Sequence, residues 1–299
     1  MQNAIKKGVL ATKQPTSGRG IPWIIFATFL FVAMDAMVKA LLQSDYDLVQ
    51  VVWARYFFHL LFLVIVFLPK LKIIGRSVNF KLQLLRSVLL LVTTSLFFAG
   101  LQYVPLAEAS SMMLISPLIV TALAVPILKE RVGKKRWAGV CIGLIGALII
   151  VRPGGAITSI GILLPAGAAI TYAVYQISTR LLSQADPITT TLFYTALLGA
   201  LLTSLATPFY WTQPSGFAWV LMIGSGFCGG IGHFALIKAF TLSPASVISP
   251  YGYLNLVWAI VFGFVLFTEF PDLWTIVGAA IITGSGLYVY SREKKRQNN

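Results

Sequence analysis

Long apolar runs alternate with short polar or basic segments along the whole chain, and this pattern predicts ten membrane-spanning α-helices. Each run is close to the ~20 residues that a helix needs to cross about 30 Å of hydrocarbon. Pro105 and Pro244 are expected to mark tight turns between closely spaced runs. The ten expected spans are residues 21–41, 48–69, 81–102, 106–128, 134–151, 158–182, 188–211, 217–240, 244–267 and 271–291.

The composition agrees with a membrane protein. Of the 299 residues, 58% are hydrophobic and only 11% are charged, whereas a soluble domain carries about 25% charged residues. A chain surrounded by lipid must satisfy its backbone polar groups internally, which helices do. We therefore expect an all-α membrane protein of ten transmembrane helices.

Few residues point to a metal, a cofactor or a disulfide. Cys141 and Cys228 lie inside apolar runs, and His59 and His233 have no companions at metal-ligand spacing. There is also no Gly-rich phosphate loop and no Ser/His/Asp set. We expect no cofactor and no metal, and an ATP-driven pump is not indicated.

Basic residues gather in alternate loops, and this predicts the orientation of the chain. The net charge is +14. Lysines and arginines precede the first span, lie between spans 2 and 3 and between spans 4 and 5, and follow span 10, whereas Arg152 lies in a loop on the other side. Cytoplasmic loops carry such an excess. We expect an inner (plasma) membrane protein with both termini cytoplasmic and basic tails at residues 1–20 and 292–299.

The two halves of the chain resemble each other. Each half has five spans, an odd number, so the halves must cross the membrane in opposite senses. We expect two inverted five-helix repeats, residues 21–153 and 154–291, a pattern typical of secondary transporters with a site near the midplane. The matched pairs are Lys39/Arg180 and Asp45/Asp186 at an offset of 141, and Pro105/Pro244, Glu130/Glu269 and Gly139/Gly278 at an offset of 139.

Local sequences in both halves resemble a known family. The first half has LKER at residues 128–131 and WAG at 137–139; the second has SPYGYL at 249–254 and EFP at 269–271. These segments resemble the EamA family of the drug/metabolite transporter superfamily. The resemblance implies two EamA repeats and transport of amino acids, nucleosides, vitamins or related metabolites. The second half is similar to bacterial carriers of S-adenosylmethionine, but differs at Gly252 and Asn255, where those carriers are expected to have charged residues.

Charged residues within spans are the first candidates for a site, because a charge in hydrocarbon is costly. Asp35 and Lys39 are four residues apart on the first span, so they share a face and are expected to neutralise each other in part. Arg55 and His59 share a face of the second span. Asp35, Arg55 and His59 either contact substrate or a proton, or form a structural network such as Asp35 with Arg55. Arg86, near an inner helix end, is expected to extend toward the interface.

Aromatic and amide side chains form two further candidate faces. The sixth span carries Tyr172, Tyr175 and Gln176 on one helical face, and the ninth carries Tyr251, Asn255 and Trp258. They would suit a planar or cationic metabolite through stacking and cation–π contacts; the alternative is an interfacial aromatic belt. His233 on the eighth span is a weaker candidate for the same cavity.

Small residues and prolines are expected to shape the helices. Gly139 with Gly143 and Gly226 with Gly230 predict close helix packing. Pro117 and Pro250 each remove a backbone donor, and therefore predict a kink that is either static or a hinge. The paired positions of Glu130 and Glu269 indicate a capping or repeat-related role.

The sequence thus predicts a secondary-active transporter that moves a small organic metabolite by alternating access. A passive channel or facilitator is an alternative, but it would need rings of like groups along a pore. A membrane-embedded enzyme is less favoured, since no catalytic set clusters. The expected partners are a small-molecule substrate, the lipid bilayer, and a coupling proton or counter-substrate, with no nucleic acid. Substrate identity, transport direction and oligomeric state are left open.

Overall fold

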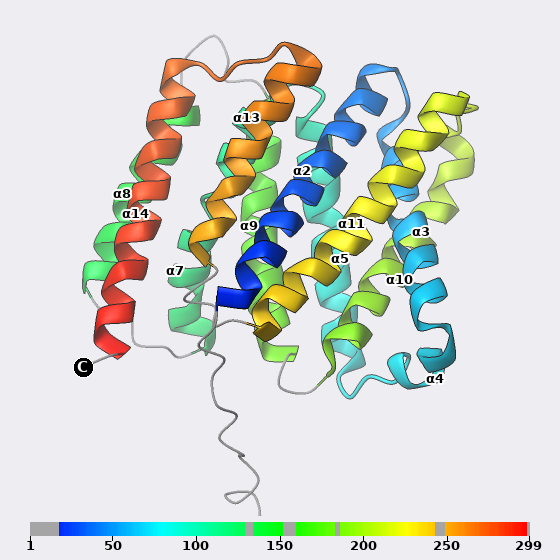
Figure 1. The fold of residues 1–299 in the computed structure, drawn as a ribbon, viewed down its shortest axis with the longest axis horizontal. Helices are drawn as coiled ribbons and strands as arrows, with labels where there is room; N and C mark the ends of the chain where they lie inside the picture. The colour runs from blue at the N-terminus through cyan, green and yellow to red at the C-terminus, as the bar shows by residue number, and fades with distance from the viewer. Residues whose placement is uncertain (1–17, 129–133, 152–159, 183–185, 243–248, 298–299) are drawn as a thin grey trace, which may run out of the picture.

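The computed structural model describes residues 18–128, 134–151, 160–182, 186–242 and 249–297. Every regular element in these ranges is a helix (Figure 1). Glu130, Pro244, most of the N-terminal tail and the expected junction between the repeats at 153/154 lie outside the described residues.

The helices follow the expected spans closely. The first half contains α2 (Ile21–Gln43), α3 (Leu48–Phe67), α4 (Leu71–Ile74), α5 (Phe80–Gly100), α6 (Leu106–Met113), α7 (Ser116–Leu128) and α8 (Lys134–Val151). The second half contains α9 (Ile160–Leu182), α10 (Ile188–Ala206), α11 (Gly216–Leu242), α13 (Leu254–Phe267) and α14 (Leu273–Gln297). Short 3-10 turns lie at Gly18–Gly20, Leu68–Lys70, Thr207–Tyr210 and Ser249–Tyr253.

Hydropathy confirms an all-α membrane protein. Six of the described helices are long and apolar enough to cross a membrane, and four shorter apolar stretches match the remaining expected spans. The last helix differs from expectation, because α14 continues to Gln297 through the basic residues instead of ending at 291.

The fourth and ninth spans are interrupted close to Pro117 and Pro250, where a kink is expected. In the fourth, α6 ends at Met113 and α7 begins at Ser116, directly before Pro117. In the ninth, a 3-10 turn at Ser249–Tyr253 contains Pro250 and gives way to α13. A proline lacks the N–H that would continue the α-helical ladder. The breaks at 114–115 and 253–254 are 139 residues apart, the offset of the repeat, so both halves carry the same discontinuity.

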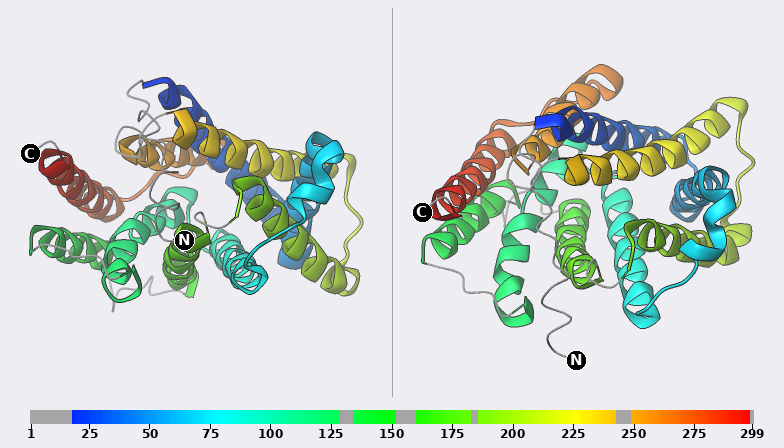
Figure 2. Two further views of the ribbon diagram at one scale, coloured as in Figure 1. Left: turned by 90° about the horizontal axis from the view of Figure 1, so that it is seen from below. Right: turned by 60° about the horizontal axis from the view of Figure 1, so that its bottom comes forward.

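Helix packing follows the inverted repeat. α2 packs on α11, and its counterpart α9 packs on the corresponding helix α5. α3 packs on α10 and α8 on α14, so these helices meet their own counterparts. Figure 2 shows the result as two layers, one with α14, α13, α2 and α11, the other with α8, α7, α9 and α5. Exchange of the two halves exchanges the layers.

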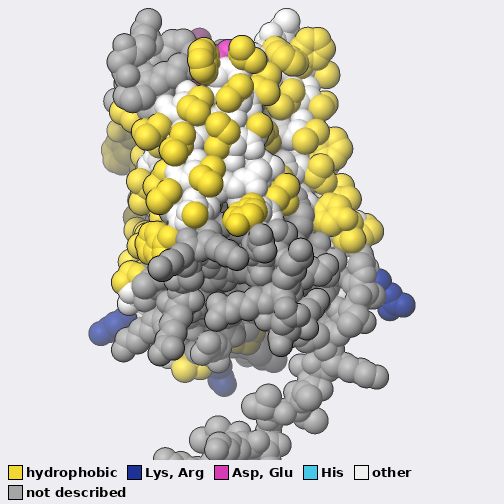
Figure 3. Space-filling view, turned by 90° about the vertical axis from the view of Figure 1, so that its left-hand side faces the viewer, with side chains coloured by type: hydrophobic (Ala, Val, Ile, Leu, Met, Phe, Trp, Pro, Cys, Tyr) yellow, Lys and Arg dark blue, Asp and Glu magenta, His cyan; other side chains and the backbone are white. Residues whose placement is uncertain are grey.

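The start of α2 and the end of α14 lie at the same end of the bundle. Figure 1 shows α2 beginning and α14 ending at its lower edge, which we call the terminal end, and we call the other the opposite end. The face in Figure 3 carries hydrophobic side chains over its described surface. The lysines and arginines visible there lie toward the terminal end, and the acidic side chains lie at the opposite end. This banding suits a bundle surrounded by lipid.

Glycines set the close contacts between helices, as the small-residue patterns predict. A Cβ on Gly143 would collide with Leu118, and one on Gly226 or Gly230 would press on α3. Among the described glycines, those of α8 and α14 bring the two helix backbones close together. A Cβ on Gly146 would lie 2.8 Å from the Gly278 oxygen, and one on Gly278 would lie 2.6 Å from the Gly146 oxygen.

We expect Gly278→Ala to destabilise the protein, because the added methyl meets the Gly146 carbonyl and Ile150 with no room to move. Overpacking of this kind costs about 1–3 kcal/mol. The matched control is Gly284→Ala on the same helix, where nothing lies within 4 Å. That change should be neutral or stabilising by up to about 1 kcal/mol. Thermal unfolding of both variants in detergent is the measurement; equal midpoints would contradict the close α8–α14 contact.

Candidate functional site

Four polar side chains from three helices form a central polar cluster, which comprises Asp35 on α2, Arg55 and His59 on α3, and His233 on α11. Arg55 and His59 share a face of α3 because they are four residues apart. Gly226 and Gly230 let α11 approach α3, since a Cβ on Gly230 would lie 3.1 Å from the His59 ring. Local sequence therefore brings these side chains together.

The two imidazoles of the cluster stack on each other. The ring centroids of His59 and His233 are 5.8 Å apart with an interplanar angle of 10°. His59 is 1% exposed, and neither of its ring nitrogens has a hydrogen-bond partner within the described part of the chain. On its other side His233 contacts the ring of Phe31.

The guanidinium of Arg55 is buried with part of its hydrogen-bonding capacity unused. The side chain is 3% exposed, and its Nε and Nη1 atoms have no acceptor among the described residues. The ring of Tyr56 lies 4.3 Å from its central carbon. Asp35, buried on α2, lies within electrostatic reach of Arg55. Neither residue forms an ion pair in the described ranges.

A second buried arginine has its N–H groups engaged. From α5, Arg86 donates to the Thr179 hydroxyl at 2.7 Å and to the Thr191 carbonyl at 3.2 Å, and further to Thr195 and Tyr175. The Tyr175 ring lies 4.4 Å from the guanidinium carbon. The expectation that Arg86 extends to the interface is wrong, because threonines on α9 and α10 hold it inside.

The two arginines occupy related places in the fold. Arg86 lies among α5, α9 and α10, which are the repeat counterparts of α11, α2 and α3, the helices of the central polar cluster. The group of α5, α9 and α10 thus surrounds Arg86 with neutral acceptors, whereas the group of α2, α3 and α11 leaves part of Arg55 without them. At the repeat offset of 141, Asp35 corresponds to Gln176, so the carboxylate too belongs to one half only.

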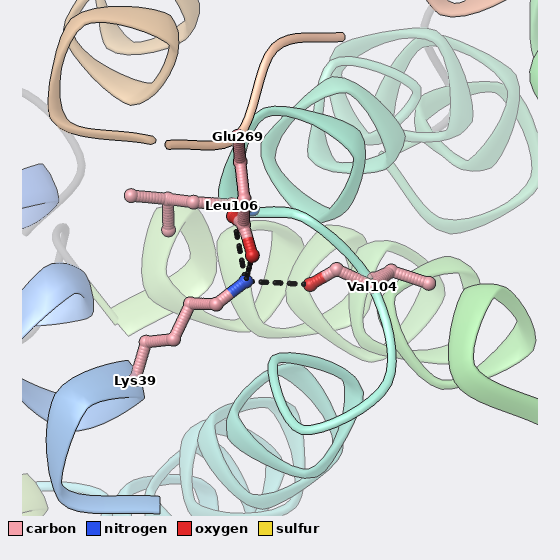
Figure 4. A network of polar contacts seen from close by, with 4 residues as sticks. All are labelled: Lys39, Val104, Leu106 and Glu269. Atoms are coloured by element: carbon pink, nitrogen blue, oxygen red, sulfur yellow. Dashed lines mark hydrogen bonds and ion pairs between the residues drawn. The ribbon is translucent and has the colours of Figure 1, made fainter. Parts of the chain in front are cut away.

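Lys39 reaches the other half of the chain (Figure 4). Its Nζ lies 2.6 Å from Oε1 of Glu269 and donates to the Val104 carbonyl at 3.0 Å. Glu269 also accepts a hydrogen bond from the Leu106 backbone N–H. The expected neutralisation of Asp35 by Lys39 is therefore wrong, because Lys39 pairs with Glu269. This contact ties α2 and the α5–α6 turn to the segment between α13 and α14.

Hydrogen bonds link loop to helix at both ends of the bundle. At the opposite end, Gln50 on α3 exchanges two hydrogen bonds with the backbone of Thr212, and the Tyr46 hydroxyl accepts from Ser215. At the terminal end, Asp186 accepts from Ser77, Val78 and Gln83. The α2–α3 and α9–α10 turns are repeat counterparts, so equivalent turns anchor both ends.

The Asp186 carboxyl lies in the turn before α10, and its hydrogen bonds determine its acidity. Desolvation alone would raise its pKa. The hydrogen bonds from Ser77, Val78 and Gln83 stabilise the charged form more strongly, so the pKa of Asp186 is held below its usual range.

The aromatic face expected on α9 lies beside Arg86. The rings of Tyr172 and Tyr175 stack with centroids 5.5 Å apart, and Tyr175 is buried. Gln176 donates to the Ser116 hydroxyl at the start of α7, at 2.9 Å. Residues of α9 thus contact the second buried arginine and the break between α6 and α7.

The face expected near the ninth span is more dispersed. Tyr251 packs with Ile24 and Ala239 near the start of α2. Trp258 lies edge-on to Phe29, and its indole N–H has no acceptor among the described residues. Asn255 is half-buried. Of the ten candidates, Asp35, Arg55, His59 and His233 are brought into one group.

Sequence reasoning missed the residues that satisfy Arg86 and Lys39. Thr191 and Thr195 are spaced four apart in the seventh span, which was a usable signal for a polar helix face. Glu269 carried a signal through its repeat match to Glu130, but nothing in the sequence indicated Lys39 as its partner.

Comparison with known proteins agrees with this architecture. The model of the EamA-like transporter family matches residues 18–152 and 159–291. Two matches cover both halves of the chain, so the protein belongs to the EamA-like transporter family, a family of multi-pass membrane transporters.

Individual relatives are similar over almost their whole length. The chain is 31% identical to an S-adenosylmethionine uptake transporter of Rickettsia felis, over 92% of this chain and 94% of that protein. It is 30% identical to a riboflavin transporter of Vibrio cholerae, over 93% and 95%. A solved crystal structure with 17% sequence identity matches with a TM-score of 0.65 over 91% of this chain and 98% of the other, and supports the fold alone.

We expect Lys39→Met to lower the free energy of unfolding by about 1–3 kcal/mol, because it leaves the Glu269 carboxylate without its cation. That carboxylate is 22% exposed, so the loss should fall below the 3–5 kcal/mol of a fully buried pair. A double-mutant cycle with Glu269→Gln is the measurement. The double variant should recover much of the loss, whereas additive losses would show that the pair is not coupled.

Proposed function

We propose that the protein is a secondary-active transporter that moves a small organic metabolite across the plasma membrane by alternating access. The family and the similar relatives support transport of a small metabolite. The mechanism is supported by the inverted halves, since a site between such halves can be opened to either side by similar motions.

The central polar cluster is the observation that carries the proposal. It lies on the middle turns of α2 and α3 and on α11, where contacts between the two halves concentrate. Charged groups inside a membrane protein face a substrate or ion pathway by default. The interrupted fourth and ninth spans add the broken helices that such carriers place near their sites.

Contacts between the halves give the alternation a physical basis. Lys39 with Glu269 closes the opposite end, while Asp186 with Gln83 holds the terminal end. In the proposed cycle these two sets of contacts break and form in turn, and the substrate site stays in place between them.

Both termini are proposed to be cytoplasmic, because the basic residues accumulate on the terminal side. A periplasm-active reporter fused after residue 299 should be inactive. The same reporter inserted after Gln213, in the α10–α11 segment at the opposite end, should be active. The reverse pattern would overturn the orientation.

The transport proposal is tested by counterflow in proteoliposomes. Vesicles loaded with unlabelled S-adenosylmethionine, riboflavin or an amino acid should accumulate the labelled form of the true substrate transiently above its external concentration. The binding site of a carrier carries unlabelled substrate out and returns with labelled substrate. Unlabelled substrate inside the vesicle therefore accelerates entry of the labelled compound. Simple equilibration without overshoot would indicate a channel, and chemical conversion of the compound would indicate an enzyme. Empty liposomes are the control.

A further inference from the structure

We propose that the central polar cluster binds a carboxylate of the transported metabolite, with Arg55 as the residue that takes its charge. This inference rests on the proposed function and specifies its substrate as an amino acid or a derivative that keeps the amino-acid carboxylate. Three features of the described residues carry it: the unused N–H groups of Arg55, the excess of positive charge, and the contrast with Arg86.

Two N–H-bearing nitrogens of Arg55 lack acceptors, although they are buried and water cannot supply them. Nε and Nη1 are both buried, and neither has a hydrogen-bond partner in the described ranges. An unsatisfied N–H is costly away from water, and a charged one more so. A guanidinium remains charged inside a protein. The ligand-free site is therefore poised for an acceptor from outside the chain.

The local charge favours an anion. Arg55 and Arg86 bring two permanent positive charges into the interior, and Asp35 brings one carboxylate within reach of Arg55. The Lys39–Glu269 pair neutralises itself. With both imidazoles neutral, the two arginines outnumber the Asp35 carboxylate, so these three groups together retain a positive charge that a ligand carboxylate would compensate. A purely cationic ligand would add to the excess.

Hydrogen-bonding groups next to Arg55 suit the same ligand. His59 lies one turn further along α3, and both of its ring nitrogens are free of partners among the described residues. A neutral imidazole offers one donor and one acceptor. His59 can therefore donate to a second carboxylate oxygen or accept from a neighbouring group of the ligand. Charge-assisted bonds of this kind are the strong ones in proteins.

Arg86 shows what a structural arginine looks like in this fold. It is as buried as Arg55, at 3% exposure, and donates to Thr179, Thr191, Thr195 and Tyr175. The repeat places the two arginines in counterpart helix groups. The same physical problem is solved within the chain at Arg86 and left open at Arg55, so Arg55 is free to bind substrate.

The first test needs no ligand. Thermal unfolding of purified, full-length protein in detergent is compared for Arg55→Gln and its matched control Arg86→Gln. Arg86→Gln should lower the midpoint by roughly 3 °C or more, because it strips partners from buried threonines. Arg55→Gln should lower the midpoint clearly less, because Asp35 loses a nearby positive charge but the Nε and Nη1 atoms of Arg55 make no hydrogen bonds to lose. An equal loss in both variants would show that Arg55 is structural and would overturn the proposal.

The second test measures binding of matched probes to the same protein. The acids are S-adenosylmethionine and the twenty common amino acids; their partners are decarboxylated S-adenosylmethionine and the corresponding amines. At least one acid should bind roughly tenfold to a hundredfold more tightly than its amine, the worth of a charged hydrogen bond. Arg55→Gln should abolish that difference, and Arg55→Lys should retain part of it. Equal binding within every pair, or no binding by any acid, would overturn the proposal.

Failure of this inference is distinguishable from failure of the proposed function. Preferential acid binding without counterflow would remove the transport mechanism and keep the carboxylate site. Counterflow of riboflavin, which has no carboxylate, with an unchanged rate in Arg55→Gln would keep the transporter and overturn the carboxylate site.

Discussion

The structure depends on one constraint, that polar groups inside the bilayer must find partners within the protein. The chain meets it largely by contacts between its two halves. Lys39 of the first half reaches Glu269 of the second, and Arg86 reaches threonines on α9 and α10. The same contacts that satisfy these polar groups also join the two halves, so the polar groups are satisfied only when the halves are packed together. Glycine contacts such as Gly146 with Gly278 then bring the helices close enough for packing to add its share.

Arg55 departs from this rule, and the departure lies where function is expected. A fold that supplies partners for Lys39 and Arg86 has the means to supply them for Arg55 as well. Its counterpart helices do so with neutral hydroxyls, which cost little to bury when bonded. An under-satisfied guanidinium beside an imidazole is expected to lower stability in the ligand-free protein. If Arg55 binds substrate as proposed, this loss is the usual trade between a stable fold and an active one.

The lengths of the apolar runs were sufficient to place the spans, because lipid imposes a length and an apolar surface on each one. The breaks at Met113 and Tyr253 were less accessible, since a proline permits several local geometries. Partner choice was out of reach. Asp35 is the neighbour of Lys39 along the helix, but the packing of the two halves against each other brings Glu269 into contact with Lys39. Similarly, the position of Arg86 near a helix end indicated the interface, while the threonines that hold it lie about a hundred residues away.

The inverted repeat also bears on how such a site can alternate. If the protein alternates as proposed, two halves of one architecture would give the outward-open and inward-open bundles similar packing, because exchanging the halves exchanges the layers. Differences in side chains then set the balance between the two states, and few are needed. In the proposed cycle, breaking the Lys39–Glu269 pair would open one end at a cost of a few kcal/mol, which is within what a ligand can offset by binding one state better. Under that proposal a single charged site between symmetric halves is enough, because the similar halves would make the two states comparable and a ligand bound at Arg55 would shift the balance between them.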